Sequence, residues 1–156
     1  MKKCLYIIIF LSMLILSACD NVSNIANDTY FEDLVPKDGT VDLLDNDPEH
    51  LLVTKTYIIK DSSDEIIYYV YEASTENTYG ALTIYMIIDQ ENKIIDCNYV
   101  ENKQAIKNEH TQNVLSKHIG NQLDEIELLS DFNTGVTMSI QSANQLITAI
   151  INKHKE

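Results

Sequence analysis

Glycine, cysteine and basic residues are all scarce in this chain of 156 residues. Only four glycines are present, and none belongs to a glycine-rich loop of the kind that cradles nucleotide phosphates. Eleven lysines and arginines face 24 acidic residues, so the formal net charge is −13. A surface of that sign repels nucleic acid and anionic lipid head groups. We therefore expect no nucleic-acid partner and no electrostatic attachment to a membrane.

The histidines and carboxylates do not predict a metal or catalytic site. His110 and His118 share a predicted helix, but eight residues place them about 80° apart around it at 3.6 residues per turn. His50 and His154 stand at no recognisable ligand spacing. Carboxylates are abundant, yet a solvated acidic face accounts for most of them, and no pair stands out as acid and base. These residues therefore mark no metal or catalytic site by themselves.

The N-terminal segment has the features of a secretory signal peptide. Lys2 and Lys3 precede an uncharged run from Leu5 to Ala18. This run of 14 residues is too short for a transmembrane helix, which needs about 20. A basic start, a short apolar run and small residues before a break are typical of a signal peptide. We expect residues 1–18 to be removed.

The four residues Leu16-Ser17-Ala18-Cys19 resemble the lipobox of bacterial lipoproteins. The resemblance implies that the thiol of Cys19 is acylated and that the mature chain of 138 residues begins there. The lipid would then hold the protein on the outer face of the cytoplasmic membrane. Loss of Lys2 and Lys3 leaves nine basic residues against 24 acidic ones, a formal charge of −15. An ordinary signal peptide with an incidental Cys19 is the alternative.

A chain of this length predicts one domain with its own core. Residues 19–31 read as a polar tether, and the domain is expected over 32–156. Its lead-in, residues 32–49, contains both prolines and predicts a loop-rich segment with one short helix or strand. With Cys4 removed and Cys19 acylated, Cys97 remains alone, so no internal disulfide is expected.

Period-two alternation predicts four strands, over residues 53–60, 66–73, 80–89 and 93–100. The first two should form a hairpin around the turn residues 61–64, and the turn 90–92 should join the last two. In the last strand the pattern places Ile95, Cys97 and Tyr99 on one face. Cys97 is then expected to point into the core as a small apolar residue.

Helices are predicted towards the C-terminus. Residues 104–119 read as a helix ended by Gly120, and residues 126–130 as a short strand. The last helix, from Ile140, has Ser139 as its expected N-cap. Its apolar positions recur at helical spacing and are Ala143, Leu146, Ile147, Ile150 and Ile151. The fold class is therefore α+β, a mostly antiparallel sheet packed against helices.

The stretch DFNTGVTMS, residues 131–139, lies directly before this helix. Gly135 allows a sharp turn or a close approach to a ligand. Thr137 lies where unpaired N–H groups and the helix dipole favour an anion. A plain turn followed by a helix cap is the alternative on geometry alone.

Residues Asp131 to Thr137 resemble the flavinylation motif of the FMN-binding domain family, Asp-x-x-Ser/Thr-Gly-Ala-Thr. That family includes the covalent-FMN subunits of the Rnf and sodium-pumping NADH:quinone reductase complexes, and lipoproteins of extracellular electron transfer. The resemblance implies that Thr137 is joined to FMN through a phosphoester by a separate flavin transferase, with FAD as donor. It also places around the cofactor the residues Asp131, Thr134, Gly135, Val136, Met138 and Ser139.

A second segment, Thr78 to Lys103, is similar to the family's Gly-Tyr-x-Gly strand and the turn and strand after it. On this match Tyr79 and Gly80 join the cofactor site. Two departures stand out. Val136 replaces the usual alanine, and residues 104–107 replace the family's Glu-Thr-Pro-Gly-Leu-Gly segment.

The resemblance implies an electron relay that receives electrons from a membrane quinol or a membrane redox protein and passes them to an extracytoplasmic acceptor. The FMN supplies the redox chemistry and the protein supplies binding and orientation. Two alternatives stay open. One is a flavin-free surface lipoprotein that acts as a binding or assembly module, and the other is an accessory subunit of a membrane redox complex.

The lipobox-like residues yield a direct prediction. Cys19→Ala removes the thiol that would be acylated, so the variant should lose its lipid and be released or misprocessed. Incorporation of radiolabelled palmitate checks this. Equal labelling of the variant and the parent would contradict the assignment of Cys19.

Overall fold

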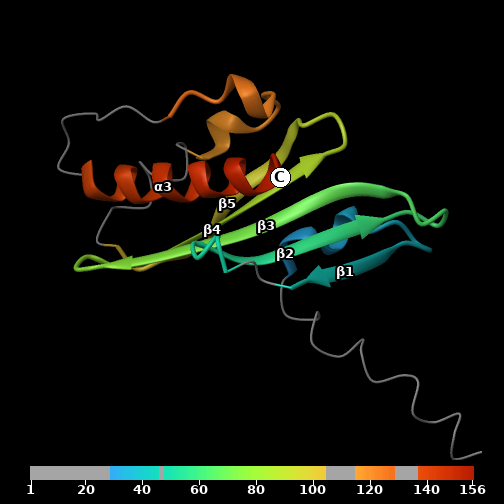
Figure 1. Cartoon of the computed structure of the whole chain (residues 1–156), viewed down its shortest axis with the longest axis horizontal. Coiled ribbons are helices and arrows are strands. Elements are labelled where there is room, and N and C mark those ends of the chain that lie inside the picture. Colours follow the sequence, from blue (N-terminus) through green and yellow to red (C-terminus); the bar gives the residue numbers. More distant parts are fainter. Residues whose placement is uncertain (1–28, 46–47, 105–114, 129–136) are drawn as a thin grey trace, which may run out of the picture. The chain divides into compact units, whose positions relative to one another are not determined.

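The computed structural model describes residues 29–45, 48–104, 115–128 and 137–156. The chain divides into two compact units, residues 1–32 and 33–156. The sheet and the helix described below belong to the second unit. The sheet has five antiparallel strands in sequence order, from β1 to β5 (Figure 1). Helix α3, Thr137–His154, lies across one face of it. The strands are β1 (Thr40–Leu44), β2 (Val53–Lys60), β3 (Ile66–Asn77), β4 (Gly80–Asp89) and β5 (Ile94–Asn102).

The predicted α+β class with a mostly antiparallel sheet is confirmed. The bounds of β2 and β4 are those that alternation predicted, whereas β3 extends four residues past Ala73 and β5 runs two past Val100. The lead-in supplies the fifth strand, β1, together with part of the 3₁₀ helix η1 (Thr29–Leu34). Helix η1 therefore begins within the last residues of the predicted tether.

One prediction about β5 is wrong, because a bulge interrupts the alternation. Ile87 pairs with Asp96 and Ile88 with Ile94, so Ile95 has no partner across the ladder. The extra residue turns Ile94, rather than Ile95, towards the core. Cys97 does point inward, as predicted, and burial raises the pKa of its thiol well above the usual range.

The main core lies between the sheet and α3. Four apolar residues of α3 recur at helical spacing and are almost completely buried, as predicted: Ala143, Leu146, Ile147 and Ile150. They meet alternate residues of the two central strands, which include Tyr71, Ala73, Ile84, Met86 and Ile88. Burial of each large side chain contributes about 2 kcal/mol. This packing holds the axis of α3 against the sheet.

The opposite face of the sheet is also withdrawn from water. Val70 pairs with Ile87 on that face, Ile59 lies on β2 beside them, and all three are completely buried. A polar contact accompanies them, in which the Tyr85 hydroxyl donates to Asp96 Oδ2 at 2.6 Å. Apolar side chains on both faces give β4 a near-continuous hydrophobic sequence, as in strands covered on both sides.

Three helix and strand predictions need correction. Helix α3 begins at Thr137, so Ser139 is a buried residue inside the first turn and not the N-cap. Of the helix predicted over 104–119, residues 105–114 lie outside the described residues. Leu115 is buried, as expected, but the short 3₁₀ helix η2 (Ser116–His118) follows it and Ile119 is extended. Residues 126–128 form no strand, and residues 129–130 again lie outside the described part.

The segment after η2 forms backbone hydrogen bonds with the start of β5. Gly120 donates its N–H to Ile94 O at 2.8 Å, and Ile94 donates to Asn121 O at 3.0 Å. Lys93 and Gln122 form an isolated bridge just ahead of the 3₁₀ helix η3 (Leu123–Glu125). The segment therefore runs beside the start of β5, and it leads to Leu128. No helix among the described residues is long and apolar enough to cross a membrane.

The C-terminal end of α3 is fastened to the sheet by His154. Its Nε2 lies 2.9 Å from Asn92 Oδ1, and its Nδ1 lies 2.9 Å from the Tyr71 hydroxyl. A carbonyl-type oxygen can only accept, so Nε2 carries a proton. The ring also meets Tyr69 edge to face, with 5.1 Å between the centroids. Burial favours the neutral form of the imidazole, in which Nδ1 accepts from the Tyr71 hydroxyl.

Acidification should weaken the fold through His154. Burial lowers the pKa of its imidazole below the usual value of 6.5. Its contribution to stability is therefore complete above pH 6.5, the value of the unfolded chain, and is lost as the pH falls towards the folded pKa. The free energy of unfolding in urea, measured from about pH 7.5 to about pH 5, should decrease more in the parent than in His154→Gln. Equal decreases in the two proteins would contradict this.

Candidate functional site

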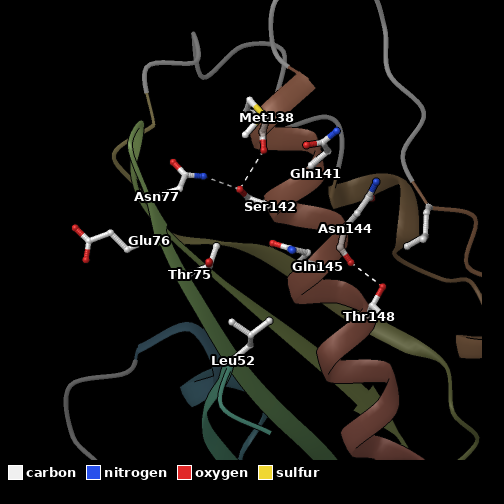
Figure 2. Close-up of a pocket in the computed structure, with 11 residues that line it drawn as sticks. Leu52, Thr75, Glu76, Asn77, Met138, Gln141, Ser142, Asn144, Gln145 and Thr148 are labelled. Atoms are coloured by element: carbon white, nitrogen blue, oxygen red, sulfur yellow. Dashed lines mark hydrogen bonds between the residues drawn. The ribbon is translucent and has the colours of Figure 1, made fainter.

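A groove of about 670 Å³ lies between α3 and the end of β3 (Figure 2). One wall is formed by the polar side of α3 and the other by the last residues of β3. Leu52 and Leu128 complete it from two loops. The lining residues are Leu52, Thr75, Glu76, Asn77, Leu128, Met138, Gln141, Ser142, Asn144, Gln145 and Thr148.

The wall formed by α3 follows from the separation of its apolar and polar residues onto two sides of the helix. Its core-facing residues pack on the sheet, and this leaves Met138, Gln141, Gln145 and Thr148 in a row beside the groove. At 1.5 Å per residue, this row extends for about 15 Å along the axis. The groove is therefore elongated, and its N-terminal end lies next to the first residue of α3, Thr137.

A chain of hydrogen bonds joins the β3–β4 hairpin to the first turn of α3. Asn77 Nδ2 donates to Ser142 Oγ at 3.0 Å, and that hydroxyl donates to the carbonyl oxygen of Met138 at 3.0 Å. On its other side, Asn77 Oδ1 accepts the N–H of Tyr79 at 2.8 Å. Figure 2 shows Asn77 turned towards Ser142, while Glu76 points away from the helix.

The groove is almost uncharged, and apolar atoms supply the larger share of its exposed surface. Amide and hydroxyl side chains are the commonest among its described lining residues, and none of these residues is basic. Leu128 and Met138 add apolar surface and are 52% and 46% exposed. Such a surface suits a largely apolar ligand with some hydrogen-bonding groups better than a free anion. The described residues contain no group of three or more His, Cys, Asp or Glu that could hold a metal ion.

Two of the predicted site residues, Tyr79 and Gly80, lie in the β3–β4 hairpin but do not line the groove. Tyr79 is 54% exposed at the turn, two residues after the groove-lining Asn77. Gly80 has a φ of +114°, and a Cβ built on it would lie 2.8 Å from the carbonyl oxygen of Lys103. Its own carbonyl accepts from Gln104 Nε2 at 3.2 Å. Gly80 therefore allows β5 to pass close to the hairpin.

The remaining predicted site residues have different outcomes. Met138 lines the groove, whereas Ser139 is buried and does not line it. Thr137 is the first residue of α3. The other predicted positions lie outside the described residues: Cys19, Asp131, Thr134, Gly135 and Val136.

Sequence reasoning missed several residues that the fold brings to the groove. Asn77 and Gln145 carried no motif of their own, and the resemblance to the FMN-binding domain family, which extends to Ser142, gave that residue no role. The amide residues of α3 do recur at spacings of three and four, opposite the apolar stripe, and this was the available signal. No comparable signal marked Asn77, since its partner lies 65 residues away.

Neither a scan against models of known protein families nor a search of curated proteins found a match to this chain.

Gly80 and Gly120 form a matched pair for a stability test. Gly80→Ala combines a positive φ with a clash against backbone and should destabilise the fold by about 3 kcal/mol. Gly120→Ala has a φ of +87° but nothing within 4 Å of the added Cβ, so only the conformational cost of about 1 kcal/mol applies. Urea unfolding of both variants measures the difference. A cost for Gly80→Ala no larger than that for Gly120→Ala would be inconsistent with the close approach of Lys103.

Proposed function

We propose that this protein carries FMN covalently on Thr137 and relays electrons at the outer face of the cytoplasmic membrane. One observation carries the proposal. The β3–β4 hairpin, which carries Tyr79 and Gly80, is joined to the first turn of α3 by the hydrogen bonds of Asn77 with Tyr79 and Ser142. Asn77 and Met138, which adjoin the two segments that resemble the FMN-binding domain family, both line the groove.

The groove is compatible with FMN. Its volume lies within the range of small-molecule sites, and its length of about 15 Å suits an elongated ligand held at one end. The neutral amides of Gln141 and Gln145 can pair with the polar edge of a flavin, and Met138 and Leu128 offer apolar contact. The described lining contains no basic side chain to hold a free phosphate. A covalent bond would retain the cofactor without one.

Attachment requires a second protein. The Thr137 oxygen would form the ester bond to the FMN phosphorus of FAD, the pyrophosphate bond would break, and AMP would leave. The hydroxyl proton would pass to a base of the flavin transferase, because the described residues beside the helix start offer no base. The unpaired N–H groups of the first turn of α3 would then hold the phosphate.

The attached FMN would supply the transfer of electrons one or two at a time. This chain would bind and orient it, and the groove residues would limit its exposure to water. Electrons would enter from a membrane quinol or a membrane redox protein and leave to an extracytoplasmic acceptor. Residues 1–18 would act as the signal peptide, and the lipid on Cys19, followed by the tether of residues 19–31, would keep the domain of residues 32–156 near its donor.

A second candidate function is a flavin-free surface lipoprotein that acts as a binding or assembly module. The uncharged amide lining favours it, because such a groove can hold a hydrogen-bonding ligand without a covalent link. Val136 and the replaced segment at residues 104–107 favour it as well. The visible absorption spectrum of protein from its native host separates the two, since only a flavoprotein absorbs there.

Thr137→Ala tests the proposed attachment. The variant should lose all flavin when the transferase is co-expressed, yet keep the helical circular dichroism of the parent, because alanine favours helix more than threonine does. The measurement is flavin fluorescence of the denatured band on a gel. Thr134→Ala should weaken modification without abolishing it.

Thr40→Ala is the matched control, because Thr40 is an exposed threonine of the edge strand β1 and does not line the groove. It should fluoresce like the parent. A Thr137→Ala band as bright as the parent's would end the proposal.

A further inference from the structure

We infer that Asn77 and Ser142 are positioning residues that hold the first turn of α3 against the β3–β4 hairpin and so set how Thr137 is presented for modification. The inference rests on the proposed function and adds to it the contact between Asn77 and Ser142. Neither residue touches the reacting atoms. Both act through the backbone next to Thr137.

Each side chain of the pair both donates and accepts a hydrogen bond. The Ser142 hydroxyl has one proton, which goes to the carbonyl oxygen of Met138, and it accepts from Asn77 at the same time. The Asn77 side chain donates through its nitrogen and accepts the Tyr79 N–H through its oxygen. The link therefore runs from the hairpin turn to the backbone of Met138, the neighbour of Thr137.

The Asn77–Ser142 link matters because it lies at the start of α3, next to Thr137. The first turn of a helix has unpaired N–H groups and frays most easily. The main apolar core begins at Ala143, more than one turn after Thr137, and His154 fastens the opposite end. Ile140 contributes apolar burial to the first turn, but apolar packing is non-directional. The Asn77–Ser142 link adds a directional constraint there, and Ser142 is only 4% exposed.

Two substitutions break the link in different ways. Asn77→Ala removes the donor to Ser142 together with the acceptor of the Tyr79 N–H. Ser142→Ala removes the acceptor of Asn77 and the bond to Met138 without adding charge. Ser142→Thr keeps a hydroxyl and should restore function. Thr40→Ala again serves as the control, because it removes an exposed hydroxyl from the edge strand β1, outside the groove.

The experiment measures transferase-catalysed flavin attachment to the full chain at several acceptor concentrations, well below the melting temperature of each variant. Asn77→Ala and Ser142→Ala should each lower kcat/KM about tenfold, as expected for one lost buried hydrogen bond that orients the acceptor. The double variant should be little worse than either single variant, because both remove the same link. Thr40→Ala and Ser142→Thr should stay within about twofold of the parent.

The outcomes separate this inference from the proposed function. If the parent is modified and the Asn77 and Ser142 variants are modified at the same rate, the positioning role is overturned and the attachment at Thr137 stands. If the rates fall only in proportion to the unfolded fraction, the pair is merely structural and the inference is also overturned. If a transferase that modifies another acceptor leaves the parent dark, the proposed function is overturned and this inference with it.

Discussion

The packing of the apolar stripe of α3 onto β3 and β4 is the interaction on which the rest of this structure depends. Leu146, Ile147 and Ile150 are completely buried against that face of the sheet. Because a helix has 3.6 residues per turn, burial of one stripe also decides where the other stripe lies. The amides of Gln141 and Gln145 are thereby placed along the groove. The packing of α3 on the sheet therefore forms the core and also positions the residues of the candidate site.

The two ends of α3 are then tied down by polar contacts of different kinds. At the C-terminal end, His154 bridges Tyr71 and Asn92 as a neutral imidazole, because burial lowers the pKa of its ring. At the N-terminal end, Asn77 and Ser142 join the hairpin to the first turn. Both links reach from the helix to a neighbouring turn or strand. They orient a helix that the apolar core alone would hold less specifically.

The groove explains how an acidic protein could keep an anionic cofactor. The chain has a formal net charge of −13, and the described lining of the groove contains no basic residue. Affinity for a free phosphate would be low under such conditions. The covalent bond proposed at the start of α3 would remove that difficulty, and neutral amides would then only need to orient the remainder of the ligand. For an anionic cofactor, the charge of the protein and the chemistry of the groove would both favour attachment over reversible binding.

Local patterns in the sequence by themselves determined four of the five strands and the apolar stripe of α3, because alternation and helical spacing act over a few neighbouring residues. The bounds of β2 and β4 and the inward direction of Cys97 belong to this group. Only the tertiary structure decided the bulge at Ile95, which depends on the register against β4. It alone also decided the contact of Asn77 with Ser142, since these residues are 65 positions apart and meet only after the helix has docked on the sheet. Contacts of that kind follow from strand order and packing, and no local pattern encodes them.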